Sequence, residues 1–270
     1  MKLSKWLSGC IFVFLILLNS SFSIFAIDSE YCLAVDGLSQ ITSLKNYYPE
    51  KLDRYLDYKQ LNPTLSDADI VLHVNIGLDK SFYSDVEEIL KPDSFLVVCN
   101  KYNILPKGYA PEGYGKYDYQ DLSLRKEAQN SFNLMQKDAR NSGINIYLVS
   151  GYRGYFAQKE IYEHYKKQDP NNVDNFSSRP GSSEHQTGLA ADINTVYSKD
   201  HFENTAEFRW LIENAYKYGF ILRYPPGKEH ITGYRFEPWH WRYVGDDVAM
   251  MVWEDDLTLE EFFAGLPVDY

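Results

Sequence analysis

Two stretches of the sequence carry side chains whose types and spacing could form a metal site with its own general base. The first, SSRPGSSEHQTGLAADI, holds His185 and Asp192, and the second, EPWHWRYVG, holds Glu237 and His240. A catalytic zinc ion takes three protein ligands, commonly imidazole nitrogens and a carboxylate oxygen, and keeps one position open for water. His185, Asp192 and His240 are therefore candidate zinc ligands. Glu237 is a candidate general base.

Spacing alone leaves a second interpretation open. Two histidines at strand edges and an aspartate that caps a turn would give the same pattern, because HxxxxxxD is less specific than a helical HExxH motif. On a regular strand Glu237 and His240 would also face opposite sides, since side chains alternate. Pro238 removes this objection because proline interrupts strand pairing and places Glu237 at a strand entrance or turn.

The segments around these residues predict short helices and strands. Apolar spacings of three and four indicate a helix that Ser123 caps and Gly143 ends, and Thr258 with Glu261 forms a capping box for a last helix. Further helices are expected over 156–167 and 208–216, and strands over 144–150, 189–194, 220–224 and 239–244. Because no βαβ rhythm is present, we expect an α+β fold with a small, mainly antiparallel sheet flanked by helices.

The part of the chain before this domain has a different, tyrosine-rich character. FYSDVEEIL is compatible with a short helix, and SFLVVC (94–99) reads as a strand. Prolines and glycines in 100–119 mark a loop. We therefore expect an N-terminal accessory region over 27–94 and the catalytic domain over 95–265.

The amino terminus has the order of a secretory signal. Lys2 and Lys5 precede the apolar run CIFVFLILL, and small residues follow it. Residues 1–26 are thus expected to be a signal peptide, with a retained membrane anchor as the alternative. In an exported chain Cys32 and Cys99 could form a disulfide, although two buried free thiols fit the sequence equally well.

Charge excludes one class of function. Without residues 1–26 the chain keeps 25 basic and 38 acidic residues, a formal net charge of −13. So acidic a chain is a poor candidate for nucleic-acid binding, which depends on neutralising phosphates. It is equally unsuited to anionic membrane surfaces, so any membrane attachment would run through the N-terminal segment. We expect a monomer.

Three motifs together resemble a known family. SGYR (150–153), RPGSSEHQTGLAADI and EPWHWRYVG occur in the order found in the VanY-type D-alanyl-D-alanine carboxypeptidases. These zinc peptidases share a fold with lysostaphin-type endopeptidases and the hedgehog amino-terminal domain. The resemblance covers residues 95–265. The pattern SxHxxGxAxD is met in full by Ser183, His185, Gly188, Ala190 and Asp192.

The resemblance implies a role for each matched position. His185, Asp192 and His240 would hold one zinc ion per chain, and Glu237 would be the general base. Arg153 would stabilise the developing oxyanion or the substrate carbonyl. The positions near the terminal carboxylate of the substrate would be Ser183 and Gln158.

Trp239 is a further candidate for the wall of the substrate cleft. On a regular strand it would share with Trp241 the face opposite His240, which favours packing in the core. The irregular backbone at Pro238 could instead turn Trp239 toward the cleft.

The resemblance implies an exported zinc D,D-carboxypeptidase that removes the terminal D-alanine from peptidoglycan stem peptides ending in D-Ala-D-Ala. An L,D-carboxypeptidase acting on tetrapeptide stems would use the same catalytic groups. An alternative of another class is a non-catalytic, metal-stabilised module that binds the cell wall, against which the presence of Glu237 argues.

Overall fold

The computed structural model describes residues 40–114, 121–195 and 201–267. The expected signal or anchor segment and Cys32 lie outside the described residues. Within the described part, no helix is both long and apolar enough to span a bilayer. Cys99 is a buried free thiol, and its Sγ lies 3.4 Å from the carbonyl oxygen of Gly181.

The described chain divides into two compact units, one of residues 40–71 with Pro267 and one of residues 72–266. The smaller unit contains the three-ten helix η1 (Pro49–Lys51) and helix α2 (Leu52–Leu61). Its centre is the fully buried Tyr55, whose hydroxyl accepts a hydrogen bond from the Tyr48 amide at 3.3 Å. Burial raises the pKa of Tyr55 to about 12. The expected boundary between an accessory region and a catalytic domain at residue 94 stays a prediction.

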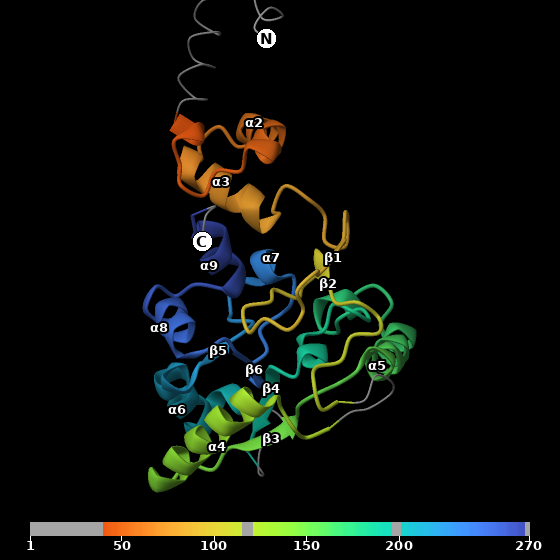
Figure 1. Ribbon diagram of the computed structural model, residues 1–270, viewed down its shortest axis with the longest axis vertical. Coiled ribbons are helices and arrows are strands. Elements are labelled where there is room, and N and C mark those ends of the chain that lie inside the picture. The colour runs from red at the N-terminus through yellow and green to blue at the C-terminus, as the bar shows by residue number, and fades with distance from the viewer. Residues whose placement is uncertain (1–39, 115–120, 196–200, 268–270) are drawn as a thin grey trace, which may run out of the picture. The chain divides into compact units, whose positions relative to one another are not determined.

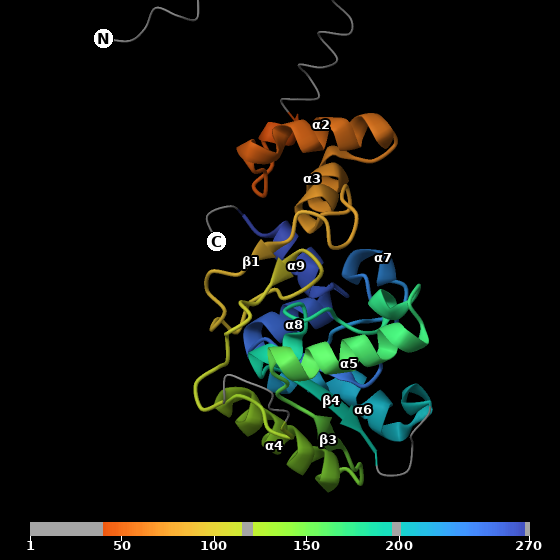
Figure 2. The ribbon, with the colours of Figure 1, turned by 90° about the vertical axis from the view of Figure 1, so that its right-hand side faces the viewer.

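A small antiparallel sheet forms the centre of the larger unit (Figures 1 and 2). Its four strands follow the order β3-β4-β6-β5, and each neighbouring pair is antiparallel. The predicted fold class is therefore confirmed. The strands are β3 (Tyr147–Ser150), β4 (Ala190–Asn194), β5 (Phe220–Leu222) and β6 (His240–Tyr243).

Helix α4 (Lys126–Asn141) packs on one face of this sheet (Figure 1). Its buried side chains recur at helical spacing, as predicted, and meet the inward side chains of the strands. The helix contributes Ala128, Phe132, Met135 and Ala139, and the central strands contribute Ala191, Ile193, Trp241 and Tyr243. Because side chains alternate along a strand, Asp192 and His240 must point to the opposite face of the sheet.

A second apolar cluster joins the C-terminal helices to β5. Helices α8 (Asp246–Glu254) and α9 (Leu259–Gly265) bury one side each against Ile221 and Val244. The predicted capping box of α9 is confirmed, since the Thr258 and Glu261 side chains bond reciprocally to each other's backbone amide.

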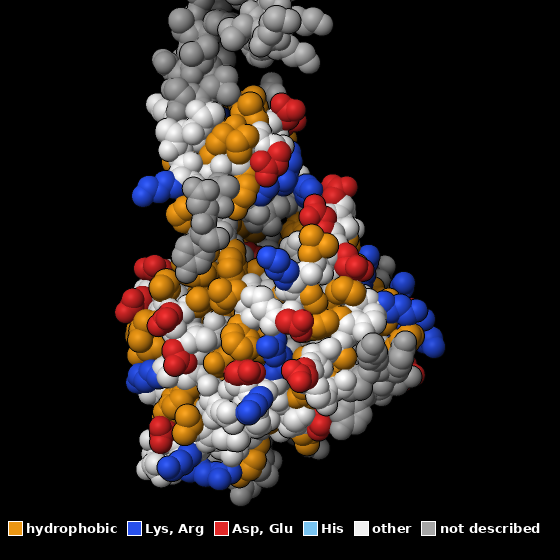
Figure 3. Space-filling view, in the orientation of Figure 1, with side chains coloured by type: hydrophobic (Ala, Val, Ile, Leu, Met, Phe, Trp, Pro, Cys, Tyr) orange, Lys and Arg blue, Asp and Glu red, His pale blue; other side chains and the backbone are white. Residues whose placement is uncertain are grey.

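The remaining elements of the larger unit are short apart from α5. They are the end of α3 (Asp67–Ile76), β1 (Glu87–Glu88), β2 (Asn103–Ile104), α5 (Tyr155–Gln168), η2 (Val173–Asn175), η3 (Glu184–Thr187), η4 (Phe202–Asn204), α6 (Ala206–Asn214), η5 (Ala215–Tyr218) and α7 (Glu229–Thr232). On the face that Figure 3 shows, basic side chains of the described residues are interspersed with acidic ones.

Two predictions for the segment before α4 are wrong. The run SFLVVC forms no strand; the carbonyl oxygens of Phe95 and Val97 instead accept hydrogen bonds from the Arg242 guanidinium, at 2.9 and 2.8 Å. FYSDVEEIL forms no helix, because Tyr83 and Asp85 adopt left-handed backbone angles, with φ of 64° and 46°. Part of it, β1, pairs with β2 in parallel.

The predicted cap of α4 is also wrong. The helix begins at Lys126, and Ser123 lies in the extended segment before it. The Ser123 hydroxyl donates to the Asp121 carboxylate at 2.9 Å, and its carbonyl oxygen accepts the Tyr152 amide at 2.9 Å. The Arg125 amide bonds to Gly188 O at 2.8 Å, so backbone pairing delays the start of the helix.

Candidate metal and active site

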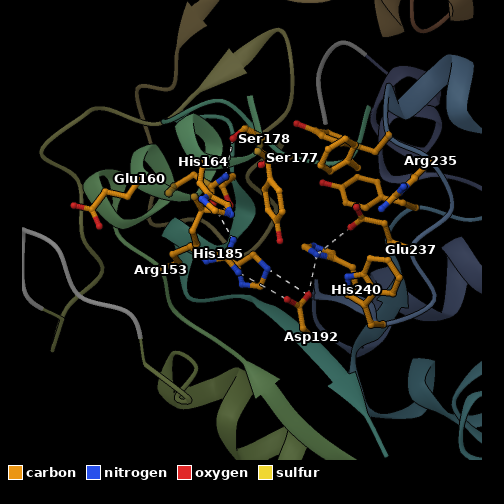
Figure 4. A pocket seen from close by; sticks show the side chains of 18 residues that line it. Arg153, Glu160, His164, Ser177, Ser178, His185, Asp192, Arg235, Glu237 and His240 are labelled. Carbon is orange, nitrogen blue, oxygen red and sulfur yellow. Dashed lines mark hydrogen bonds and ion pairs between the residues drawn. The ribbon is translucent and has the colours of Figure 1, made fainter. Parts of the chain in front are cut away.

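Strand register brings two of the predicted ligands together. Asp192 of β4 lies directly opposite His240 of β6, on the face away from α4. His185 comes from η3, a three-ten turn that Gly188 ends in the left-handed conformation with φ of 68°. One ligand atom from each of His185, Asp192 and His240 lies within 4.8 Å of the others (Figure 4). The structure thus unites all three predicted ligands.

The three predicted ligands direct donor atoms at one another, and a hydrogen bond orients His185. Nδ1 of His185 is held by the carbonyl oxygen of Gly151 at 2.6 Å, which leaves Nε2 directed at Asp192 Oδ1, 3.4 Å away. Nδ1 of His240 lies 3.2 Å from the same carboxylate oxygen. Asp192 Oδ1 is buried and makes no hydrogen bond. Two imidazole nitrogens and one carboxylate oxygen are a donor set that fits zinc.

The charges around the ligands favour a bound cation. Burial would raise the pKa of Asp192, but His185 and His240 outweigh it and hold the pKa well below its usual range. Burial lowers the pKa of His185, so its imidazole is neutral and able to ligate. Burial also acts to lower the pKa of His240, yet the Asp192 and Glu184 carboxylates on either side raise it to about 9. A strongly basic imidazole is a good metal ligand.

Glu237 lies beside the ligands in the turn before β6, as Pro238 predicted. Its side chain is buried, and Oε2 lies 3.8 Å from His240 Nδ1 (Figure 4). Burial raises the pKa of Glu237 to about 7, although His240 and Arg153 act in the other direction. A carboxylate with such a pKa can both take and return a proton near neutral pH.

Arg153 follows β3 and points at the same site. Its Nη2 lies 3.8 Å from Asp192 Oδ2 and donates to Ser150 Oγ at 3.0 Å. Its Nη1 donates to Gln158 Oε1 at 2.8 Å, and the amide nitrogen of Gln158 donates to Ser178 O at 2.6 Å. Both ends of the buried Gln158 side chain are therefore occupied within the protein. Nε of Arg153 is buried and makes no hydrogen bond.

These groups share a cavity of about 550 Å³. Ser183 is buried in its wall, and Trp239 is half-buried there. Because β6 begins at His240, Trp239 precedes the strand and escapes its alternation, so the expectation of core packing holds for Trp241 alone. The cavity continues along α5 and two loops, whose contributions are Glu160, Ile161, His164, Tyr165, Phe176, Ser177, Ser178, Tyr224, Tyr234 and Arg235.

A buried carboxylate behind His240 was not predicted from the sequence. Glu184 is fully buried, and its Oε2 lies 3.7 Å from His240 Nε2 without a hydrogen bond of its own. Its other oxygen accepts Arg223 Nε at 2.8 Å and Arg242 Nη1 at 2.6 Å. The sequence held one signal for it, since Arg223 and Arg242 both lie within short predicted strands. An arginine that is buried in a sheet requires an acidic partner.

Comparison with known proteins agrees with this geometry. The VanY family, described as D-alanyl-D-alanine carboxypeptidase, matches residues 121–246. The chain is 33% identical over 178 residues to the bifunctional D-Ala-D-Ala dipeptidase and carboxypeptidase VanXYC of Enterococcus gallinarum, a match that covers 62% of this chain and 92% of the relative.

Two solved structures share the fold. The LdcB LD-carboxypeptidase has 38% identity and a TM-score of 0.62, with 68% of this chain and 92% of the other covered. A mutant of the D,D-pentapeptidase VanY from a VanB-type resistance cassette, in complex with Zn(II), has 33% identity and a TM-score of 0.52, with 62% and 98% covered. By sequence and by fold, the chain belongs to the VanY family of D-alanyl-D-alanine carboxypeptidases.

Proposed function

We propose that the chain is an exported zinc D,D-carboxypeptidase that removes the terminal D-alanine from peptidoglycan stem peptides ending in D-Ala-D-Ala. One zinc ion would be held by His185, Asp192 and His240. The observation that carries the proposal is the convergence of these ligand atoms beside the buried Glu237 carboxylate in one cavity. A purely structural metal site would have no use for that carboxylate, which argues against a non-catalytic wall-binding module.

Each group has a distinct task in the proposed reaction. Zinc supplies Lewis acidity, since it polarises a carbonyl oxygen and lowers the pKa of a water molecule to about 7. Glu237 takes the proton from the attacking water and delivers it to the nitrogen of the departing D-alanine. Its pKa of about 7 suits both transfers.

Arg153 would stabilise the oxygen that becomes negative as the water adds to the scissile carbonyl. A fixed positive charge or donor in this position is commonly worth about 3 kcal/mol in the transition state. Ser150 and Gln158 hold the guanidinium in place, so Gln158 would act through Arg153. Ser183 and Trp239 line the same cavity and would contact the substrate.

The L,D bond of a tetrapeptide stem is a second candidate for the bond that is hydrolysed. The LdcB LD-carboxypeptidase has a higher identity and TM-score with this chain, 38% and 0.62, than the VanY D,D-pentapeptidase, 33% and 0.52. This likeness favours hydrolysis of the L,D bond of a tetrapeptide stem. Both reactions release one D-alanine and can use the same zinc, base and arginine.

One assay distinguishes the two bonds. Purified protein with a measured zinc content is incubated separately with pentapeptide and tetrapeptide stems, and released alanine is detected by mass. Alanine from the pentapeptide supports the D,D assignment, whereas release from the tetrapeptide alone replaces it with the L,D assignment. Absence of release from both stems, in protein that holds zinc, would refute the proposed carboxypeptidase activity.

A further inference from the structure

Two loops far apart in the sequence line the cavity. The first, residues 173–179, contributes Phe176, Ser177 and Ser178 to the lining, and the second, residues 232–235, contributes Tyr234 and Arg235. Their backbones meet where the Arg235 amide donates to Asn175 O at 2.9 Å. We call these segments the first and second cleft loops.

A buried lysine lies behind both loops. Lys101 is 2% exposed, and its Nζ donates to Asp174 O of the first cleft loop at 2.6 Å and to Gly233 O of the second. The ammonium also lies over the rings of Tyr234 and Phe82, 4.5 and 4.8 Å from their centroids. One side chain thus bonds to the backbone of both loops.

The environment of Lys101 is suited to a cation. Two carbonyl oxygens and the negative faces of aromatic rings compensate an ammonium group, which would otherwise be costly to bury. Burial lowers the pKa of Lys101 to about 8, which the Asp174 charge opposes and Arg179 reinforces. The group therefore remains largely protonated at pH 7. An apolar side chain of the same length would leave both carbonyls without this donor.

Gly233 is fitted to the same contact. Its backbone is left-handed, with φ of +77°, and a β-carbon there would lie 2.8 Å from Lys101 Cδ and 3.0 Å from Nζ. The absence of a side chain lets the lysine reach the carbonyl oxygen of the second cleft loop. A glycine at position 233 is therefore needed for the close contact between the Lys101 side chain and this backbone.

Tyr83 adds a second connection between the loops. Its hydroxyl lies 3.3 Å from the Tyr234 hydroxyl and accepts the Arg179 amide at 3.3 Å. The Arg179 guanidinium covers the Tyr83 ring at 3.9 Å and makes a bidentate ion pair with Asp174, at 3.0 and 2.7 Å. The segment before the family match thus grips both cleft loops.

The cleft loops in turn contact the catalytic groups. Tyr234 packs on Tyr224 at 4.7 Å between ring centroids, and Tyr224 packs on the ligand His240 at 4.9 Å. On the other side Ser178 O accepts the Gln158 amide that orients Arg153. A shift of either loop would therefore change the shape of the cavity next to the metal position.

We propose that Lys101 is a positioning residue that fixes the two cleft loops relative to each other and so determines how tightly the stem peptide is held. This inference rests on the proposed carboxypeptidase function. It assigns Lys101 no contact with the substrate and no part in proton transfer. Its loss should therefore weaken substrate binding far more than it changes turnover of bound substrate.

The main test is Lys101→Met, with Lys59→Met as the control because Lys59 lies in the smaller unit and lines no part of the cavity. We expect KM for the better stem peptide to rise about tenfold, with kcat within about threefold of the parent. Zinc content should not change. Amide hydrogen exchange in residues 173–179 and 232–235 should accelerate about tenfold, with no change in α4.

Specific outcomes would overturn the inference. A folded Lys101→Met protein with parental KM and parental exchange in both cleft loops refutes it, as does an equal effect of Lys59→Met. If Lys101→Met does not fold, Tyr83→Phe provides the test, since it removes only the hydroxyl that joins Tyr234 and Arg179. An increase of about threefold in KM is expected there, and an unchanged KM contradicts the inference. Inactivity of the parent protein refutes the proposed function, while the exchange measurement still tests whether Lys101 fixes the two cleft loops.

Discussion

At the scale of single residues, the decisive feature is the difference between Glu237 and the ligands beside it. His185 and His240 hold the pKa of Asp192 low despite its burial, whereas burial raises the pKa of Glu237 to about 7. The same functional group is therefore held as a permanent anion in one position and as a proton acceptor in the other. Burial acts on both carboxylates, so the neighbouring charges, and not residue type, divide the two roles.

Glu237→Ala tests this division. Removing the base should lower kcat on stem peptide by about 10²–10⁴-fold, because general base catalysis contributes that much. Zinc content and thermal stability should remain, since the ligands His185, Asp192 and His240 are intact. The matched control is Glu160→Ala, an exposed carboxylate in the wall of the same cavity. Unchanged turnover in Glu237→Ala would remove this residue from the mechanism.

Glu184 should control metal affinity through His240. In the metal-bound protein Nδ1 of His240 would ligate, and Nε2–H would donate to Glu184 Oε2, now 3.7 Å away. Glu184→Gln removes the charge and should weaken zinc binding about 10–100-fold in competition with a chelator. It should also lower stability, because Arg223 and Arg242 lose their shared anion. Parental zinc affinity in the folded variant would contradict this role.

At the scale of elements, the site depends on a close approach of backbone segments. A β-carbon on Gly151 would lie 2.3 Å from Ser123 O and 3.1 Å from Asp121 O. Both oxygens are fixed by hydrogen bonds to the turn that holds Gly151, and Gly151 O holds His185 Nδ1. The turn after β3 therefore requires glycine, and its position controls a ligand.

Gly151→Ala should thus damage both folding and metal binding. The turn must move away from residues 121–123, which we expect to cost about 1–3 kcal/mol of unfolding free energy, as overpacking typically does. Displacement of the carbonyl that orients His185 should weaken zinc binding about tenfold. Gly108→Ala is the control, since its β-carbon would meet no atom within 4 Å. Denaturant unfolding and chelator competition measure the two effects, and parental values in both would refute the argument.

The elements also show where sequence reasoning succeeds. The periodicity of α4 and the capping box of α9 are local patterns, and both were predicted. SFLVVC was wrongly predicted as a strand. The carbonyl oxygens of Phe95 and Val97 accept hydrogen bonds from Arg242, which lies far away in the sequence. The charge cluster of Glu184 and two arginines was missed for the same reason. Only the assembled sheet brings these partners together.

At the scale of the whole molecule, the sequence predicted the fold class and the three side chains that the structure brings together as a candidate metal site. It could not predict how the site is supported from outside the family match, at residues 121–246. Arg223 connects Glu184 to Glu260 of α9, with bonds of 2.8 and 2.7 Å to the two acids. Lys101 secures the cleft loops from the other end. Support of this kind depends on tertiary contacts that leave no periodic trace in the sequence.

The docking of α9 should give the whole protein a measurable dependence on pH. Glu261 accepts Lys228 Nζ at 2.8 Å and the Thr258 amide at 2.7 Å. Burial alone would raise the pKa of Glu261, but these bonds outweigh it and hold the pKa below the ordinary value of 4.5. The ionised form is thus favoured by folding, so its contribution is present above pH 4.5 and is lost as the pH falls through the folded-state pKa.

Glu261→Gln isolates this charge, because glutamine can still complete the capping box. At pH 7 we expect the variant to lose about 0.5–1 kcal/mol of unfolding free energy, the size of a partly exposed ion pair. The difference from the parent should shrink as the pH is lowered below 4.5. Glu254→Gln, at the exposed end of α8, should match the parent at every pH. Chemical unfolding between pH 3 and pH 7 measures the effect. A stability difference that stays constant over this range would show that the Glu261 charge does not help to hold α9 in place.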